Sequence, residues 1–231
     1  VGFFVFLAFF AVPVVLLVRQ ALLSRQDEQG GAEWYPAGLL AAWATCYGLC
    51  LLAIACLWIG MSSEGLEATV QAYFAEVMNA VAHRMGAGSD AQQANLIVSE
   101  GVVSILPGLV ALSWLVVLIV NGALSQGFLT RFGVNLRPSP NFGMMELPSW
   151  LTVIAAILLM SAIILPGAFG YFATNAALLV ALPFLLVGVA IAHVLAGRVS
   201  AGPLLLILFY FLLLMSKWLI VLVAFLGLIE Q

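Results

Sequence analysis

Long apolar runs separated by short polar segments dominate the chain. Many of these runs reach 18 or more residues, close to the ~20 that a helix needs to cross the roughly 30 Å hydrocarbon layer. The runs are continuous and do not alternate between polar and apolar, so they predict helices and not barrel strands. The pattern therefore predicts an all-α transmembrane bundle with spans at about residues 1–23, 37–61, 102–124, 149–165, 169–192 and 203–228.

Residues 63–86 follow a different pattern, because apolar and polar positions share this segment. Apolar side chains recur at steps of three and four, which is the spacing of one helix face. These positions are Leu66, Val70, Tyr73, Phe74, Val77, Val81 and Met85. Glu64 and Glu67 lie in the first turn, where the helix dipole favours acids. We predict an amphipathic helix at the membrane surface, with its apolar face against lipid or protein.

Prolines and glycines mark the breaks between and within the spans. Pro13 lies inside the first span and predicts a kink, because it removes one bond of the helix ladder. Residues 24–33 form a short polar connector. Pro166 and Gly167 interrupt a long apolar run and predict a tight turn between the fourth and fifth spans.

Composition agrees with a membrane protein, since 65% of the residues are apolar and 7% are charged. The formal net charge of −3 and the absence of basic clusters argue against nucleic acid as a partner. The connections that follow the first, third and fifth spans hold Arg19, Arg25, Arg131, Arg137 and Arg198. The other two hold Arg84 alone, so the positive-inside rule places the arginine-rich loops in the cytoplasm.

With six spans, this orientation puts residues 63–86 and both ends of the chain outside. Val1 is not an initiator methionine, and we expect further spans before it.

Lys217 is the clearest candidate for function, because it lies inside the sixth predicted span. It follows Pro203 by 14 residues, which places it ~16 Å below the outer boundary of a straight helix. An ionisable group at such depth is costly and needs a partner. Asn175, at ~9 Å depth in the fifth span, is the expected partner, with Glu100 second and Tyr210 on the same face as Lys217. A structural lysine bonded to carbonyls is the alternative.

Other reactive residues favour structural roles. Cys46, Cys50 and Cys56 lie in the second span without histidines or acids at ligand spacing, so we expect packing residues and no metal site. His193 lies at a span exit and is expected to be interfacial. No catalytic triad, carboxylate pair or phosphate loop is present in the sequence. We therefore expect neither an enzyme nor a bound cofactor.

Several short motifs resemble one family. They are Arg19–Arg25, Glu33–Pro36, Asn121–Gln126, Asn135–Pro140, Glu146–Trp150, Leu182–Phe184 and Leu208–Tyr210. Together they resemble the YybS-like family of bacterial inner-membrane proteins, a domain of unknown function often encoded beside ribosomal protein genes. The resemblance covers essentially the whole chain and implies a multi-pass protein with no assigned chemistry. That family is distantly similar to the substrate-binding membrane components of energy-coupling-factor vitamin transporters.

Two functional hypotheses follow. The first is a small-ligand-binding transport component, which the intramembrane Lys217 favours. The second is a non-catalytic subunit or assembly factor that docks partner membrane proteins, which the acidic outer helix favours. Lipid is the expected environment in both, and neither hypothesis identifies the ligand or the partner.

Overall fold

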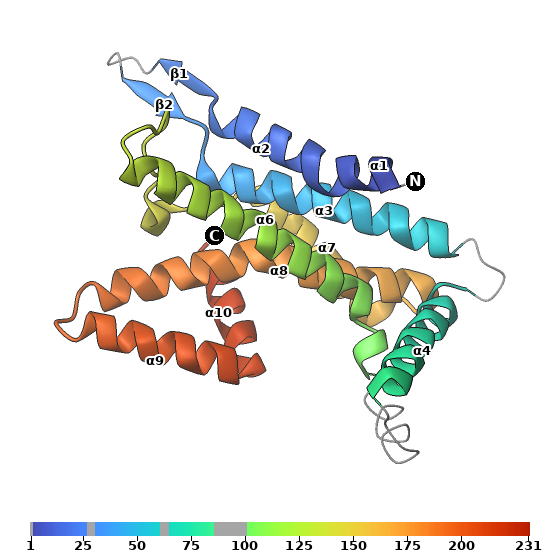
Figure 1. The fold of residues 1–231 in the computed structure, drawn as a ribbon. Coiled ribbons are helices and arrows are strands. Elements are labelled where there is room, and N and C mark those ends of the chain that lie inside the picture. The colour runs from blue at the N-terminus through green and yellow to red at the C-terminus, as the bar shows by residue number, and fades with distance from the viewer. Residues whose placement is uncertain (1, 27–30, 61–64, 86–100) are drawn as a thin grey trace. The chain divides into compact units, whose positions relative to one another are not determined.

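The computed structural model of the chain describes residues 2–26, 31–60, 65–85 and 101–231, without the side chains of residues 82, 83 and 85. The described part is almost entirely helical, which confirms the all-α prediction (Figure 1). In chain order the elements are α1 (Gly2–Phe6), the π-helical turn η1 (Leu7–Ala11), α2 (Val12–Ala21), β1 (Ser24–Gln26), β2 (Ala32–Trp34), α3 (Ala37–Gly60), α4 (Leu66–Met85), α6 (Leu106–Arg131), the 3₁₀ turn η2 (Phe142–Met144), α7 (Ser149–Ile164), α8 (Gly167–Ala196), α9 (Gly202–Met215) and α10 (Lys217–Ile229).

The chain forms two compact units, and four helices contribute residues to both. Unit 1 comprises Val1–Tyr47, Trp114–Ile154 and Val180–Gln231. Unit 2 comprises Gly48–Ser113 and Ala155–Leu179. Each unit is described by itself below.

The first helical region of unit 1 is irregular where the sequence predicts a kink. The π-helical turn η1 ends just before Pro13, which has no N–H to offer the carbonyl of Phe9. The Trp114 indole N–H donates to that carbonyl at 2.8 Å, and the Tyr47 hydroxyl donates to the neighbouring Ala8 carbonyl at 2.7 Å. Two aromatic side chains from other helices therefore satisfy backbone groups that the irregular turn leaves free.

A two-stranded antiparallel hairpin replaces the plain connector expected between the first two spans. Strands β1 and β2 pair Ser24 with Trp34 and Gln26 with Ala32 (Figure 1). The Arg25 Nε donates to Glu33 Oε2 at 2.6 Å across this pair. The hairpin places the Trp34 end of the connector directly before the start of α3.

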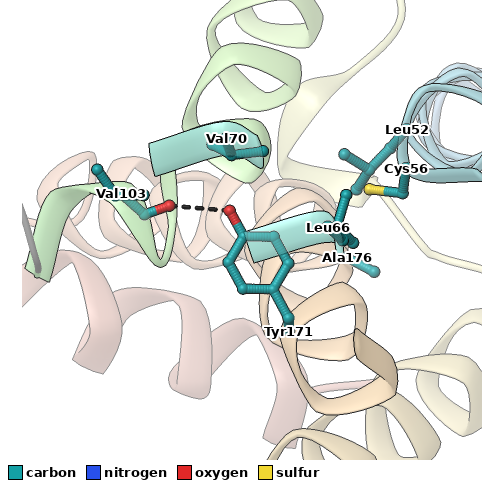
Figure 2. Packing of buried hydrophobic residues seen from close by; sticks show 7 residues of the cluster. All are labelled: Leu52, Cys56, Leu66, Val70, Val103, Tyr171 and Ala176. Atoms are coloured by element: carbon teal, nitrogen blue, oxygen red, sulfur yellow. Dashed lines mark hydrogen bonds between the residues drawn. The ribbon is translucent and has the colours of Figure 1, made fainter. Parts of the chain in front are cut away.

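The core of unit 2 gathers side chains from α3, α4, α8 and the segment before α6. Its buried members are Leu52, Cys56, Leu66, Val70, Val103, Tyr171 and Ala176 (Figure 2). The Tyr171 hydroxyl points to the Val103 carbonyl and donates to it at 2.9 Å, as the dashed line in Figure 2 marks. This polar tip therefore has a partner, which is the usual condition for burying tyrosine.

The amphipathic helix is confirmed as α4, although residues 63 and 64 and residue 86 lie outside the described residues. The N-terminal half of its apolar face is covered, because Leu66 and Val70 are buried in the core of unit 2. Further along the same face, Tyr73, Val77 and Val81 are exposed. Half of the predicted face therefore packs on protein, and the other half is open.

Most of the predicted spans coincide with a described helix, but the lengths of the helices differ from those predicted. Among the described residues, four helical regions are long and apolar enough to cross a membrane: Gly2–Ala21, Ala37–Gly60, Leu106–Arg131 and Gly167–Ala196. The fourth predicted span is α7, which has 16 residues and is ~24 Å long, shorter than the hydrocarbon layer. The third predicted span is longer than expected, because α6 continues without interruption to Arg131.

The sixth predicted span is wrong as a single straight helix. It is instead α9 and α10, which meet at 115° (Figure 1). Ser216 is the cause, because its backbone is extended and its hydroxyl caps α10 by accepting from the Leu219 N–H at 3.4 Å. A serine followed by a lysine thus provides a helix start inside an apolar run.

The end of α10 also disagrees with an outside C-terminus. The side-chain oxygen of Gln231 accepts a hydrogen bond from the Leu147 N–H, in the loop before α7. The arginine count assigns that loop to the cytoplasm. Close packing of α10 on α8 fixes this path, since a Cβ on Gly188 or Gly227 would overlap the opposing helix backbone. The α9–α10 pair therefore begins and ends next to arginine-bearing loops.

Candidate functional site

Lys217 is the first residue of α10 and lies directly after the bend at Ser216. Its side chain is exposed, and the structure records no hydrogen bond or ion pair from it to any described residue. Its neighbours are apolar and open as well, with Leu214 80% and Trp218 70% exposed. Lys217 is thus an exposed lysine of unit 1.

Tyr210 lies on α9 but does not hydrogen-bond to Lys217. Its hydroxyl is 3.4 Å from His193 Nε2, and the two rings meet edge to face at 5.7 Å. The other ring nitrogen of His193 is 2.9 Å from the Val189 carbonyl. The tyrosine therefore ties α9 to the last turns of α8 and supplies no hydroxyl to the lysine.

Asn175, the expected partner of Lys217, is fully buried within unit 2. Its side-chain oxygen accepts from the Gly108 N–H at 2.7 Å. Its amide donates to the carbonyls of Ser104 and Tyr171 at 2.9 and 2.8 Å. These bonds connect α8 to the start of α6, where the first N–H groups of a helix have no partner of their own. The side chain thus has a complete structural role inside its unit.

Glu100, the second expected partner, lies outside the described residues. The ligand site formed by all four residues therefore stays a prediction. Lys217 and Tyr210 belong to unit 1 and Asn175 belongs to unit 2.

The described part of the chain holds no group of side chains that could bind a metal ion. No group of three or more histidine, cysteine, aspartate or glutamate side chains lies together there. Cys46, Cys50 and Cys56 lie on α3, and Cys56 is part of the core of unit 2. This distribution agrees with a packing role for Cys56.

A different residue, Arg137, has the environment of a binding site. It lies in the loop between α6 and α7 and is only 7% exposed. Its guanidinium donates to the Ala21 carbonyl at the end of α2, at 3.0 Å. Its own carbonyl accepts from Gln126 Nε2 at 2.8 Å and from Asn135 Nδ2 at 2.9 Å. Burial lowers the pKa of Arg137, because desolvation disfavours its charged form.

Arg137 lines a pocket of about 260 Å³ at the start of α3. Ala37 and Gly38 of the first helical turn lie on one side, and Asn141 and Glu146 of the loop lie on the other. A second pocket of about 410 Å³ lies between the hairpin and α3 and includes Arg25 and Glu33. The exposed Arg25 guanidinium holds the pKa of the Glu33 carboxyl below its ordinary value, through their hydrogen bond and charge attraction.

Sequence reasoning treated Arg137 only as a marker of topology. The motifs that carry the family resemblance point to this region, because several of them meet at this end of unit 1. Glu33–Pro36, Asn121–Gln126, Asn135–Pro140 and Glu146–Trp150 all contribute a residue to the Arg137 hydrogen bonds or to one of the two pockets. Their proximity depends on the fold, and no spacing along the chain reveals it.

Comparisons with known proteins give one match. The family described as "Predicted membrane protein (DUF2232)" matches residues 32–230. Searches of curated proteins and of solved structures returned no match. The family match spans most of the chain and agrees with its long apolar helices. The chain is an integral membrane protein that belongs to the DUF2232 family of predicted membrane proteins.

Proposed function

We propose that this protein is a non-catalytic subunit of the bacterial inner membrane that docks a partner membrane protein against the α9–α10 bend. The partner contributes an acidic side chain that pairs with Lys217. The resemblance to YybS-like proteins supports the bacterial inner membrane as its location. The observation that carries the proposal is the exposed Lys217, to which the described residues offer no ion pair.

An ionised lysine inside the membrane has a high free-energy cost unless an acid pairs with it, and this cost is the reason to propose a partner protein. Helix α9 has 14 residues, so the bend lies ~21 Å along the helix from the arginine-bearing turn before it. An ionised group near the bilayer centre costs about 2.5–3.5 kcal/mol on insertion scales. The described part of the chain offers Lys217 no acid within ion-pair distance. A carboxylate from outside the chain would remove this cost.

The neighbouring side chains favour a protein partner over a soluble ligand. Leu214, Met215 and Trp218 are all strongly exposed around the lysine. Apolar residues with one charged group are typical of a surface that receives another transmembrane helix. A ligand site would instead enclose the lysine among polar groups.

A small-ligand-binding transport component is the second candidate, and one feature favours it. Broken helices in transporters direct the positive end of a half-helix toward anionic substrates, and Lys217 occupies that position in α10. The two pockets of unit 1 described above are not lined by Lys217. The exposed apolar surface around the bend therefore favours docking of a partner protein over ligand transport.

Site-specific crosslinking in native membranes tests the docking proposal. A photoreactive residue at position 214 should crosslink to one defined protein. The adduct should disappear in Lys217→Met and persist in Lys217→Arg, which keeps the charge. Position 163 is the matched control, because Ile163 is also 80% exposed but lies on α7.

Docking at this surface is excluded if position 214 reacts only with lipid, or if its protein adduct is unchanged in Lys217→Met. A small molecule that co-purifies with the wild type and is lost in Lys217→Met would instead support the transport candidate.

A further inference from the structure

The buried arginine of unit 1 has more hydrogen-bonding capacity than its surroundings use. A guanidinium carries five N–H donors. The structure records one hydrogen bond from that of Arg137, to the Ala21 carbonyl. Among the described residues, no carboxylate lies within ion-pair distance of it. A buried charge without a counter-ion is costly, so this position favours an anion from outside the chain.

The pocket beside Arg137 offers a second group that attracts anions. Ala37 and Gly38 are in the first turn of α3, a helix of 24 residues, and both line the pocket. The first backbone N–H groups of a helix have no acceptor within it, and the helix dipole favours negative charge there. The same cavity is therefore lined by a positively charged residue, Arg137, and by the first turn of α3, a combination that suits an anion.

Gly38 brings the two walls of the pocket together. A Cβ at this position would overlap the backbone carbonyl of Glu146, so only glycine lets the loop approach the helix this closely. The approach places the Glu146 segment opposite the first turn of α3. The pocket is thus a defined part of the fold.

We propose that this pocket binds a phosphate group, supplied either by a phospholipid headgroup or by a free phosphate compound. Its volume of about 260 Å³ is below the roughly 300–1,000 Å³ of sites that hold whole drug-sized ligands, which favours a single small group. The pocket also lies where α2 and α6 end and α3 begins, next to polar loops. Phospholipid headgroups occupy this level of a membrane, and planar arginine binds phosphate with paired donors.

Glu146 is expected to modulate the site, because this exposed acidic residue lines the same pocket. Its negative charge repels a bound anion. A rival role follows from the same placement: Glu146 could turn toward Arg137 and neutralise it without any ligand. The wild type distinguishes the two roles, since phosphate stabilises it if Glu146 only repels the anion and does not if Glu146 already neutralises Arg137.

The test uses the full chain, purified in a nonionic detergent and freed of lipid. Thermal unfolding is followed while short-chain phosphatidylglycerol, diacylglycerol of the same chain length, or inorganic phosphate is added. Phosphatidylglycerol should raise the melting temperature, and diacylglycerol, which lacks the phosphate, should not. A shift with phosphatidylglycerol alone identifies the lipid headgroup as the source, whereas a shift with inorganic phosphate as well shows that the free anion suffices.

Variants locate the binding. Arg137→Met should weaken phosphate-dependent stabilisation by about ten- to a hundredfold in apparent affinity, the usual range for losing charge-assisted bonds. Methionine suits the buried position, because apolar replacements of buried charges are often tolerated. Arg131→Met is the matched control, since Arg131 is exposed at the end of α6 and should keep wild-type affinity. Glu146→Gln, which leaves Arg137 in place, should bind severalfold more tightly.

Three results would each overturn the proposal. The first is that neither phosphatidylglycerol nor inorganic phosphate stabilises the wild type beyond diacylglycerol. The second is that Arg131→Met weakens binding as much as Arg137→Met. The third is that Glu146→Gln leaves phosphate affinity unchanged or lower. This measurement still tests the proposal if Arg137→Met does not fold.

Discussion

The two units differ in how completely they pair their buried polar side chains. In unit 2, Asn175 is fully buried and makes three hydrogen bonds to backbone groups. In unit 1, Arg137 is almost as buried, yet its guanidinium makes one hydrogen bond to the described residues. A side chain with all its partners in place stabilises the fold and leaves little for a ligand. A buried polar side chain that lines a pocket and lacks some of its hydrogen-bond partners is therefore a better indicator of a binding site than the residue type alone.

The strongest test of this comparison removes the paired residue. Asn175→Leu keeps the side-chain volume and leaves the Gly108 N–H and the Ser104 carbonyl without partners. Buried unpaired groups cost about 1–3 kcal/mol each, so we expect a loss of about 2–4 kcal/mol in the free energy of unfolding. Denaturant unfolding in mixed micelles measures it.

Asn121→Leu is the control for this substitution, because Asn121 is exposed on α6 and the described structure gives its side chain no hydrogen bond. Its stability should equal that of the wild type. A similar loss in both variants would mean that the pairing of Asn175 is not what stabilises unit 2.

The close approach that allows this pairing provides the next largest effect. A Cβ on Gly108 would lie 2.7 Å from the Asn175 carbonyl oxygen and 2.9 Å from its side-chain oxygen. Gly108→Ala must therefore push α8 away from the start of α6, at an expected cost of about 1–3 kcal/mol. The free energy of unfolding is measured as for Asn175→Leu.

Gly122→Ala is the matched control on the same helix, since nothing lies within 4 Å of a Cβ at that position. Gly122→Ala should raise the free energy of unfolding by about 0.5–1 kcal/mol, through helix propensity alone. Equal and favourable changes at both glycines would show that α6 and α8 are not held at this distance.

The helices were largely predictable because length and hydropathy are local properties. The starts of α3 at Ala37, of α7 at Ser149 and of α8 at Gly167 follow within two residues from the prolines and apolar runs around them. The start of α10 was not predicted, because a single serine inside an apolar run changes hydropathy little, although its hydroxyl can cap a helix.

The sites were less predictable, because they depend on contacts between distant residues. The pairing of Lys217 with Asn175 was derived from depth along straight helices, and the 115° bend removes that basis. Two of the three partners of Asn175 are 67 and 71 residues away in the chain, and they are backbone groups that no sequence pattern distinguishes. Arg137 was visible as a charge, but its burial and its pocket arise only when loop, helix ends and hairpin meet.

A second arginine of unit 1 completes the comparison and predicts the smallest effect. Arg25 pairs with Glu33 on the open hairpin, where water already solvates both charges. Glu33→Gln should leave the melting temperature at neutral pH almost unchanged, since exposed ion pairs contribute little and salt screens them.

The pKa of Glu33 is lowered in the folded protein, so the pair stabilises above the ordinary carboxyl pKa and loses its effect as the pH falls through the lowered value. Any difference between wild type and variant should therefore be present at neutral pH and vanish in acid. Melting curves at both pH values check the sign. A destabilisation as large as that of Gly108→Ala would mean that exposed pairing, and not only burial, determines stability at this end of unit 1.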